Sequence, residues 1–457
     1  MSVLALELND AGLVSATAEG WRDEGPGYAL LDPEAPLFGA AARASARLRP
    51  RRLNDRYWAE LSGAPLPRQE SYARSHADLV CAHLAAIWRG RTAGADEAVF
   101  VVPGYLGRES LGLLLGIAAE LEIGVTGLVD AAVAATTALA PGRELVHLDF
   151  HLHGALLTRL EQSGAVRRGE VAALPRAGLR PLEDAWAHAV AGAFVRQTRY
   201  DPLHAAESEQ ALYDRLGDWL PALEDDEEIE ISLELKGEPL QVRLARGAVL
   251  DAAAGAYRAL AERLEGWRRP GMELAVQLSH RGAALPGLAR YLENLPGVEL
   301  LRLAPDAAVS GALARLPHIV SGEGTVRFVT ALPALDTRAA PAVAAGAAPG
   351  AANGVAPTHL LYEGEARPIS AQGLGVGIAP PADRPGVVLA GPASGISRLH
   401  CTVREEHGRI VVEDHSRYGT FVNDVRIRER AELRPGDRIR VGSPGVLLHA
   451  IRVRSEP

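Results

Sequence analysis

The sequence predicts a multidomain protein in which an α/β domain is followed by a linker and an all-β domain. Strand-like and helix-like runs alternate over residues 1–335, which is typical of an α/β domain. Residues 340–357 carry no charge and no apolar period, so we place an Ala/Pro/Gly linker at residues 336–357. In residues 358–457, short β-rich runs are separated by frequent turns, which favours a β-sandwich.

The elements of the first domain follow from the spacing of apolar residues. Continuous apolar runs of four to eight residues predict buried strands, and apolar positions three and four apart predict helices. We expect strands at residues 3–8, 98–103 and 274–278, and a long strand or hairpin at 145–160. We expect helices at residues 110–121, 247–267 and 286–294.

Composition limits the classes of function. The 457 residues carry a net charge of −9, so the composition does not predict a nucleic-acid-binding protein. Cys81 and Cys401 are the only cysteines, which favours a reducing compartment. We expect no membrane contact, since no apolar run reaches the ~18 residues of a membrane span. The N-terminus has no basic region before an apolar one, so we also expect no signal peptide.

Three motifs near the C-terminus occur in a fixed order. Residues 397–400 are Ser-Arg-Leu-His, residues 414–423 are Asp-His-Ser-Arg-Tyr-Gly-Thr-Phe-Val-Asn, and residues 436–437 are Gly-Asp. They resemble the forkhead-associated (FHA) domain over residues 360–453. The resemblance implies a β-sandwich whose loops at one end read phosphothreonine peptides.

By this resemblance, Ser397 and Arg398 would touch phosphate, His400 would brace its loop, and Asn423 would tie two loops together. The phosphopeptide-binding residues that it implies are Ser397, Arg398, Ser416, Arg417, Thr420 and Asn423.

Two positions depart from the family pattern. The Gly-Arg of the family corresponds to Gly377-Ile378, and the Asn before Gly-Thr is Tyr418. Either Arg384 or Arg417 is then the candidate to replace the lost guanidinium, and the alternative is a contact that needs no phosphate.

Residues 1–335 resemble the ATPase domain of DnaK-type heat-shock chaperones, in the actin and sugar-kinase superfamily. The resemblance implies an actin-like, two-lobed α/β domain. It rests on a Val-Val-Pro-Gly-Tyr strand end at 101–105, an expected connecting helix at 126–134, a hairpin at 230–245 and a strand with its following helix at 274–288.

The glycines that would hold nucleotide in that family are replaced at three places. Backbone amides approach phosphate closely only where no Cβ intervenes. The first loop has Glu7 and Asp10, the second keeps Asp149, and Ser279 stands in the adenosine loop. The negative charge of Asp10 would repel a triphosphate.

The lysines of the family are missing as well. The only lysine is Lys236, so residues 47–56 offer no cleft lysine, and neither Leu212 nor Tyr213 is the lysine expected to contact adenosine. We therefore predict a pseudo-ATPase with a degenerate cleft and no cofactor, with ATP and magnesium as the alternative.

Three further patterns are open to two interpretations. His147, Asp149, His151 and His153 alternate along an expected strand, which predicts either a metal site or a solvated strand face. The acidic run at 224–228 is either a solvated turn or a site for a basic partner. Tyr57 and Trp58 beside three arginines are either an interaction patch or packed aromatics.

We conclude from the sequence that the chain is a cytoplasmic, bacterial, non-catalytic adaptor or regulatory scaffold. Its partner would be a protein, with or without a phosphothreonine. The first alternative is an ATP-dependent chaperone-like ATPase with an FHA recognition domain. The second is a metal-dependent enzyme.

Overall fold

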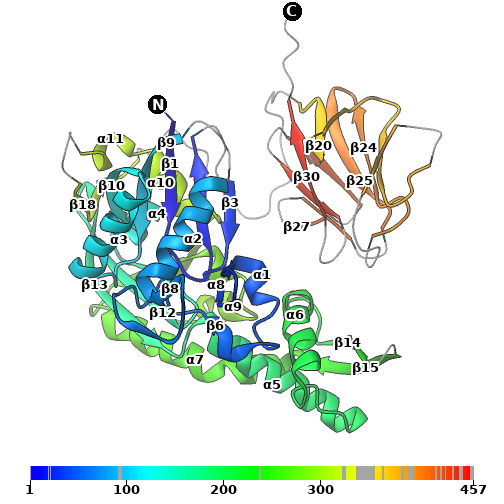
Figure 1. Ribbon diagram of the computed structural model, residues 1–457, viewed down its shortest axis with the longest axis horizontal. Coiled ribbons are helices and arrows are strands. Elements are labelled where there is room, and N and C mark those ends of the chain that lie inside the picture. Colours follow the sequence, from blue (N-terminus) through cyan, green and yellow to red (C-terminus); the bar gives the residue numbers. More distant parts are fainter. Residues whose placement is uncertain are drawn as a thin grey trace, which may run out of the picture. The chain divides into compact units, whose positions relative to one another are not determined.

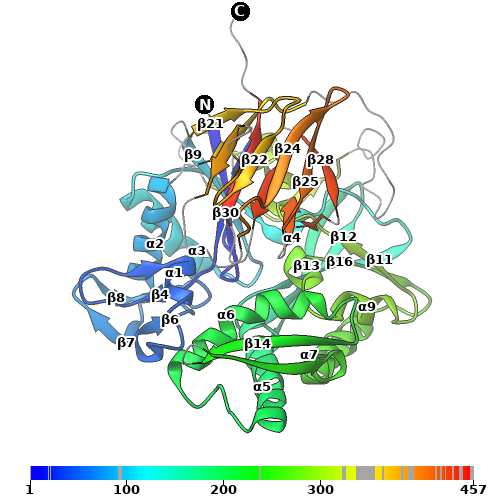
Figure 2. The same cartoon turned by 90° about the vertical axis from the view of Figure 1, so that its right-hand side faces the viewer.

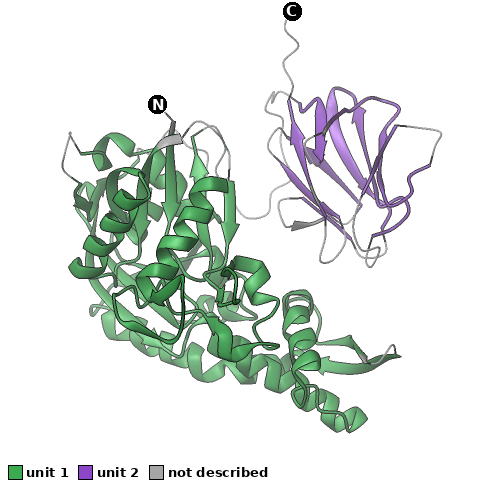
Figure 3. Ribbon diagram, viewed as in Figure 1, with its two compact units in different colours: residues 1–341 green, residues 342–457 purple. Residues whose placement is uncertain are grey.

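The chain divides into two compact units, residues 1–341 and residues 342–457 (Figure 3). The structure is a computed structural model. It describes residues 2–18, 20, 22–90, 95–235, 238–321, 326–335, 356–362, 365–381, 385–389, 396–416, 419–422, 425–427, 429–434, 437–441 and 446–452. The predicted linker at 336–357 lies outside the described residues except for its last two positions.

The first sheet of the N-terminal unit has the order β18-β10-β9-β1-β2-β3 (Figure 1). Strands β1 to β3 form an antiparallel meander, and β9, β10 and β18 continue the sheet in parallel on the other side of β1. The bounds are β1 Ser2–Glu7, β2 Leu13–Thr17, β3 Arg22–Gly25, β9 Ala95–Val102, β10 Gly124–Asp130 and β18 Phe328–Val329.

The second sheet repeats this arrangement with the order β17-β16-β11-β12-β13-β19. Strands β11 to β13 form the meander, and β16 and β17 run parallel to β11. The predicted long strand or hairpin at 145–160 is a hairpin. The bounds are β11 Arg143–Phe150, β12 Gly154–Gln162, β13 Ala165–Pro175, β16 Glu273–Leu278, β17 Val298–Arg302 and β19 Ala331–Pro333.

Helices cover these sheets and bury their apolar faces. Helices α2 and α3 contribute to the core beside the first sheet, and α5, α6 and α7 to the core beside the second. The helices are α1 Gly39–Arg43, α2 His76–Gly90, α3 Arg108–Glu120, α4 Ala131–Ala135, α5 Leu179–Thr198, α6 Ala206–Ala222, α7 Arg246–Trp267, α8 His280–Ala283, α9 Leu288–Glu293, α10 Ala307–Leu313 and α11 Leu316–Ile319.

Short strands complete the unit. The hairpin of β14 Glu228–Leu235 and β15 Glu238–Ala245 packs against α6 and α5 (Figure 2). The other short strands are β4 Ala29–Leu30, β5 Leu37–Phe38, β6 Leu53–Asn54, β7 Pro65–Glu70 and β8 Ala73–Ser75.

The helix predicted at residues 126–134 is wrong over its first half. Residues 124–130 pair in parallel with β9, and their apolar side chains enter the core. The helix begins only after Asp130, whose carboxylate accepts a hydrogen bond from the backbone N–H of Val133 and caps α4.

Arg315 is a buried clamp between α10 and α4. Its side chain is almost fully enclosed and donates only to backbone carbonyls, which include those of Gly311, Thr136 and Ala134. Burial lowers the pKa of Arg315 to about 10, so the guanidinium keeps its charge at neutral pH.

The C-terminal unit is a sandwich of two sheets, with orders β21-β20-β30-β29-β26-β27 and β23-β22-β24-β25-β28 (Figure 2). Alternate residues such as Val376, Val403, Val412 and Ile439 fill the space between the sheets. The bounds are β20 His359–Tyr362, β21 Glu365–Pro368, β22 Leu374–Gly377, β23 Gly386–Val388, β24 Cys401–Glu406, β25 Arg409–Asp414, β26 Thr420–Val422, β27 Val425–Arg426, β28 Arg430–Leu433, β29 Arg438–Val441 and β30 Val446–Ile451.

Within the described residues, the helices are too short or too polar to cross a membrane.

We predict that Arg315→Met destabilises the N-terminal unit. Methionine fills similar space but leaves several buried carbonyls without their charged donor, which costs about 2–4 kcal/mol of unfolding free energy. Denaturant unfolding of the full chain measures this loss. The control is Arg290→Met on α9, whose side chain is exposed, and equal stability of the two variants would contradict the clamp.

Candidate functional site

The turns of the two corresponding hairpins, β1–β2 and β11–β12, meet between the sheets. The side-chain amide of Asn9 donates to Oδ2 of Asp149 at 2.8 Å and to the carbonyl of Phe150 at 3.1 Å. Oδ1 of Asp10 accepts from the backbone N–H of Leu152 at 3.0 Å and lies 3.1 Å from Nδ1 of His151. Residues 9 and 10 of one repeat are therefore tied to residues 149–152 of the other.

Arg281 joins these turns from a third element. Ser279 caps α8 by accepting from the N–H of Gly282, and Arg281, the second residue of this short helix, is buried. Its Nη1 lies 3.0 Å from Oε1 of Glu7 and 3.5 Å from Oδ1 of Asp149, while Nη2 donates to the carbonyl of Gly12 at 2.6 Å. We call Glu7, Asn9, Asp10, Asp149, His151 and Arg281 the cleft cluster.

Burial and charge set the protonation of this cluster. Burial opposes the ionisation of Asp149, but the charge of Arg281, followed by those of His151 and His147, outweighs it and holds the pKa of Asp149 well below its usual range. Burial raises the pKa of Glu7, and Arg281 offsets this only in part. Burial opposes the charge of Arg281, yet the two carboxylates raise its pKa above the ordinary value.

The hollow beside the cleft cluster is small. It has a volume of about 20 Å³ and is lined by side chains that include Glu7, His147, Asp149, Ser279 and Arg281. This is room for about one water molecule, whereas small-molecule sites measure ~300 Å³ or more. Protein side chains fill the junction of the two hairpins.

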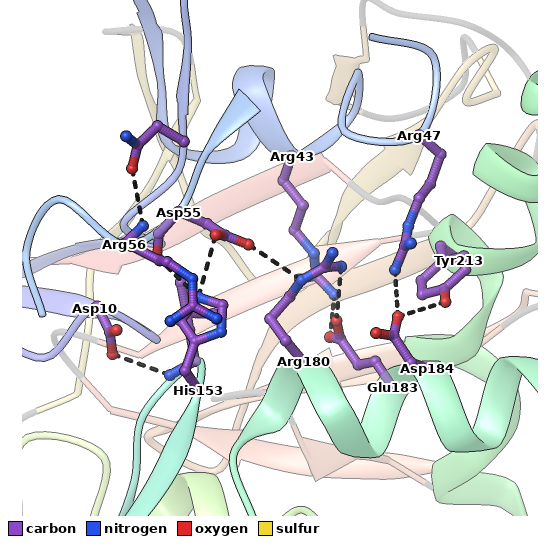
Figure 4. A network of polar contacts seen from close by, with 12 residues as sticks. Asp10, Arg43, Arg47, Asp55, Arg56, His153, Arg180, Glu183, Asp184 and Tyr213 are labelled. Carbon is purple, nitrogen blue, oxygen red and sulfur yellow. Dashed lines mark hydrogen bonds and ion pairs between the residues drawn. The ribbon is translucent and has the colours of Figure 1, made fainter. Parts of the chain in front are cut away.

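A second polar network closes the outer part of the junction (Figure 4). Arg47 pairs with Asp184 of α5 at 2.5 Å and lies 3.6 Å from the ring centroid of Tyr213 of α6. The guanidinium of Arg47 is therefore held both by an ion pair with Asp184 and by a cation–π contact with Tyr213. The guanidinium of Arg47 thus lies against Tyr213, one of the two positions where the chaperone resemblance predicts a lysine that contacts adenosine.

The same network continues toward the hairpin turns. Arg43 pairs with Glu183 at 2.7 Å, and Asp55 contacts both His153 at 3.1 Å and Arg180 at 3.2 Å. The segment of residues 43–55 is therefore held against α5 by the ion pairs of Arg43, Arg47 and Asp55 (Figure 4).

The expected histidine strand is shorter and more enclosed than the pattern suggests. Strand β11 ends at Phe150, so His151 and His153 lie in the turn. His147, Asp149 and His151 are buried, which contradicts a solvated face. In the part of the chain that the structure describes, no group of three or more His, Cys, Asp or Glu side chains is placed to hold a metal ion.

In the C-terminal unit, His400 connects two loops at one end of the sandwich. Its ring is fully buried and precedes β24, while the other loop follows β25, the partner of β24. Nδ1 accepts from the backbone N–H of Ser397 at 3.1 Å, and Nε2 then carries the proton and donates to the carbonyl of Gly419 at 3.0 Å. Burial lowers the pKa of His400, which favours this neutral form.

The second loop is organised around Asp414. Its Oδ1 accepts from the N–H of Ser416 at 3.0 Å and from the hydroxyl of Thr420 at 2.8 Å, and Ser416 Oγ accepts from the N–H of Gly419 at 2.7 Å. Thr420 is fully buried. The hydroxyl of Thr420 is therefore held inside the loop by Asp414, and its assignment to the phosphopeptide-binding residues stays a prediction.

The first loop presents Arg398 to solvent. Its backbone is fixed to the two residues that follow β22, since the N–H of Ala379 donates to the carbonyl of Arg398 at 3.0 Å and the N–H of Ile378 to that of Ser397 at 3.2 Å. A Cβ at Gly377 would collide with the carbonyl of Arg398, so this close approach requires glycine. The side chain of Arg398 is exposed, while Arg384, Arg417, Tyr418 and Asn423 lie outside the described residues.

Comparison with protein families gives a match at this end of the chain. Residues 383–442 match the family model of the FHA domain. The C-terminal unit therefore carries an FHA domain, as its motifs predict, and this class of module binds protein partners through phosphothreonine. No curated protein gives a significant match to the chain.

The family match does not extend to the N-terminal unit, where the chaperone-ATPase resemblance stays a prediction. Sequence reasoning missed Arg281, the central side chain of the cleft cluster. The available signal was its position, two residues after Ser279, in the loop where the resemblance requires glycine.

We predict that Arg281→Ala destabilises the N-terminal unit by about 3–5 kcal/mol at neutral pH, because two buried carboxylates lose their cation. Arg143→Ala, which breaks exposed ion pairs with Glu273 and Glu299, is the control and costs less than about 1 kcal/mol. Denaturant unfolding of the full chain measures both.

The effect of Arg281→Ala depends on pH in one direction. Because Arg281 depresses the pKa of folded Asp149, the stability it gives is present above the ordinary pKa of 3.8 and is lost as the pH falls below that value. The difference between wild type and variant therefore narrows in acid. A constant difference from neutral pH to pH ~3 would contradict the ion-pair account.

We predict that His400→Ala loosens both loops of the FHA domain. It removes the acceptor of the Ser397 N–H and the donor to the Gly419 carbonyl that His400 supplies, at a cost of about 2–4 kcal/mol. Amide hydrogen exchange of peptides from 396–422 in the full chain measures the change. The control is His407→Asn, at an exposed position whose φ of 52° Asn tolerates. Unchanged exchange protection in His400→Ala would show that His400 does not hold the two loops together.

Proposed function

We propose that the chain is a non-catalytic adaptor or regulatory scaffold. A degenerate chaperone-ATPase-like domain is joined in it to an FHA module that binds a protein or a phosphothreonine peptide. The observation that carries the proposal is the FHA domain, with its exposed Arg398 held on a loop braced by His400. An exposed guanidinium on a fixed loop suits a phosphate, because charge-assisted bonds of Arg to phosphate are strong and directional.

The repeated sheets support the chaperone-like part of the proposal. That resemblance places two β-hairpins around a cleft, and the two corresponding hairpin turns here contact each other through Asn9, Asp10 and Asp149. The third loop of the resemblance falls at Ser279, whose helix supplies Arg281. The three loops assigned to nucleotide from the sequence therefore lie together.

The contents of the junction support the absence of catalysis. Nucleotide catalysis would need space for phosphates and a metal ion held by carboxylates. Instead, the guanidinium of Arg281 lies between Glu7 and Asp149, and only about 20 Å³ is left beside them. A ligand would have to displace a buried cation paired with two carboxylates, which is costly.

We predict that the full-length chain neither hydrolyses ATP nor binds it with measurable heat, with or without magnesium. The reason is that Arg281 and Arg47 occupy the inner and outer parts of the junction. Steady-state phosphate release and titration calorimetry test this. Hydrolysis that disappears in Asp149→Ala would overturn the proposal and establish the alternative, an ATP-dependent chaperone-like ATPase.

We predict that Arg398→Ala weakens binding of phosphothreonine peptides by about tenfold or more, since a charge-assisted bond is worth roughly 1.5–3 kcal/mol. A phosphothreonine peptide library selected on the full chain supplies the probe, and its best sequence is then measured with and without phosphate. The control is Arg409→Ala, an exposed arginine at the opposite end of β25. Equal affinity of both peptides for wild type and Arg398→Ala would mean that the domain recognises its partner through another surface.

A further inference from the structure

A hollow on the N-terminal unit is lined by arginines. It has a volume of about 340 Å³ and is formed by Leu48, Arg49, Pro50, Arg51, Arg52 and Arg68. Leu48 is 43% exposed at its rim. We call this feature the arginine hollow, and neither the FHA site nor the cleft cluster uses it.

Three of its four arginines are held in place by carboxylates. Asp32 pairs with Arg49 at 2.7 Å and with Arg52 at 3.4 Å, and Glu70 pairs with Arg68 at 3.1 Å. Two carboxylates against four guanidinium groups leave two positive charges in excess. Arg51 is exposed and has no ion-pair partner among the described contacts, so the hollow presents an unmatched cation in a fixed frame.

The arginine hollow does not suit nucleic acid. Single strands bind on exposed aromatic faces that stack with the bases. The neighbouring Tyr57 and Trp58 are buried, and the indole N–H of Trp58 donates to His83 at 3.1 Å. The aromatic interaction patch considered from the sequence is therefore wrong, because the two aromatic side chains are packed in the core. The chemistry of the arginine hollow fits a carboxylate-rich segment of a protein.

The chain itself carries such a segment, the acidic turn at residues 224–228. Glu224 accepts from the N–H of Gly287 at 2.6 Å, and Glu227 pairs with Arg246, so the ends of the turn are fixed. Asp225 and Asp226 are exposed between them, without an ion-pair partner among the described contacts. The two unpaired carboxylates of the acidic turn are equal in number and opposite in sign to the two excess positive charges of the arginine hollow.

The acidic turn of one molecule does not reach its own hollow. The backbone N–H of Arg47, beside the hollow, donates to Gln210 near the start of α6 at 2.8 Å. The acidic turn begins after the end of that helix, fourteen residues further on, which at 1.5 Å per residue is about 20 Å away. A second copy of the chain is required to bring the two features together.

We propose that the arginine hollow of one copy receives the acidic turn of a second copy. This goes beyond the adaptor role, because it states how the adaptor assembles. The contact joins two different surfaces, so repetition gives a reciprocal dimer, a ring or an open chain of molecules. Exposed ion pairs are weak and screened by salt, so the assembly forms at low ionic strength and dissociates at high salt.

Sedimentation velocity of the full chain at about 0.01 M and about 1 M salt, where the Debye length falls from ~30 Å to ~3 Å, tests the proposal. We expect concentration-dependent oligomers only at low salt. Arg51→Glu and the double variant Asp225→Arg/Asp226→Arg each weaken association at least tenfold. The controls are Arg89→Glu on α2 and Glu109→Arg/Glu120→Arg on α3, which make the same charge changes at other exposed positions and leave association unchanged.

Mixing the two variants gives the decisive result. The Arg51→Glu chain keeps its acidic turn, and the double variant keeps its hollow, so an equimolar mixture forms one contact and stops at the dimer. Such capped dimers support the proposal. A monomeric wild type at low salt, wild-type association of Arg51→Glu, or a mixture without dimers overturns it. Binding of a free peptide of residues 222–230 by a chain that stays monomeric would also overturn the second copy as occupant.

Discussion

The buried guanidinium of Arg281, between Glu7 and Asp149, is the interaction on which the N-terminal unit depends. The three residues come from distant parts of the sequence and from three different elements. Removing all three charges from water is expensive, and only their mutual pairing makes it tolerable. The hairpin turns of both repeats and the start of α8 must therefore stay together for as long as the unit is folded. A junction that would otherwise be the natural place for a ligand is closed by a cation that belongs to the chain.

Arg315 solves a similar problem by different chemistry. It has no carboxylate and is satisfied by the backbone carbonyls of α4, α10 and their neighbours. Carbonyls do not titrate, so this clamp is insensitive to acid wherever the arginine stays charged, whereas the pairing of Arg281 weakens once Asp149 is protonated. Arg315 joins α10 to α4, and Arg281 joins the turns of the two hairpins. Acid is therefore expected to loosen the junction of the repeats before it loosens the packing of the helices.

The sequence predicts best where the signal is local. The strand at β9 follows from a continuous apolar run, and the FHA domain follows from three short motifs in order, because turn chemistry and strand patterns are contained in a few neighbouring residues. It predicts poorly where the cause is a distant partner. Residues 124–130 form a strand because β9 lies beside them, and Thr420 is buried because Asp414 captures its hydroxyl. Apart from its place two residues after Ser279, the sequence around Arg281 does not show that its side chain is enclosed while that of Arg51 is exposed, since both follow from which elements meet in space.

The use of arginine throughout the chain follows from its physical properties. With a single lysine among 48 basic residues, guanidinium groups fill every cationic role. A guanidinium stays charged when buried, is weakly hydrated and offers five donors in one plane. It can therefore bridge two carboxylates at Arg281, stack on Tyr213 at Arg47 and lie exposed to solvent at Arg398. The environment separates these roles: enclosed guanidinium groups such as those of Arg281 and Arg315 hold elements together, whereas the side chain of Arg398 is exposed. Whether an arginine holds elements together or faces a partner is therefore set by the elements that surround its side chain, and not by the arginine itself.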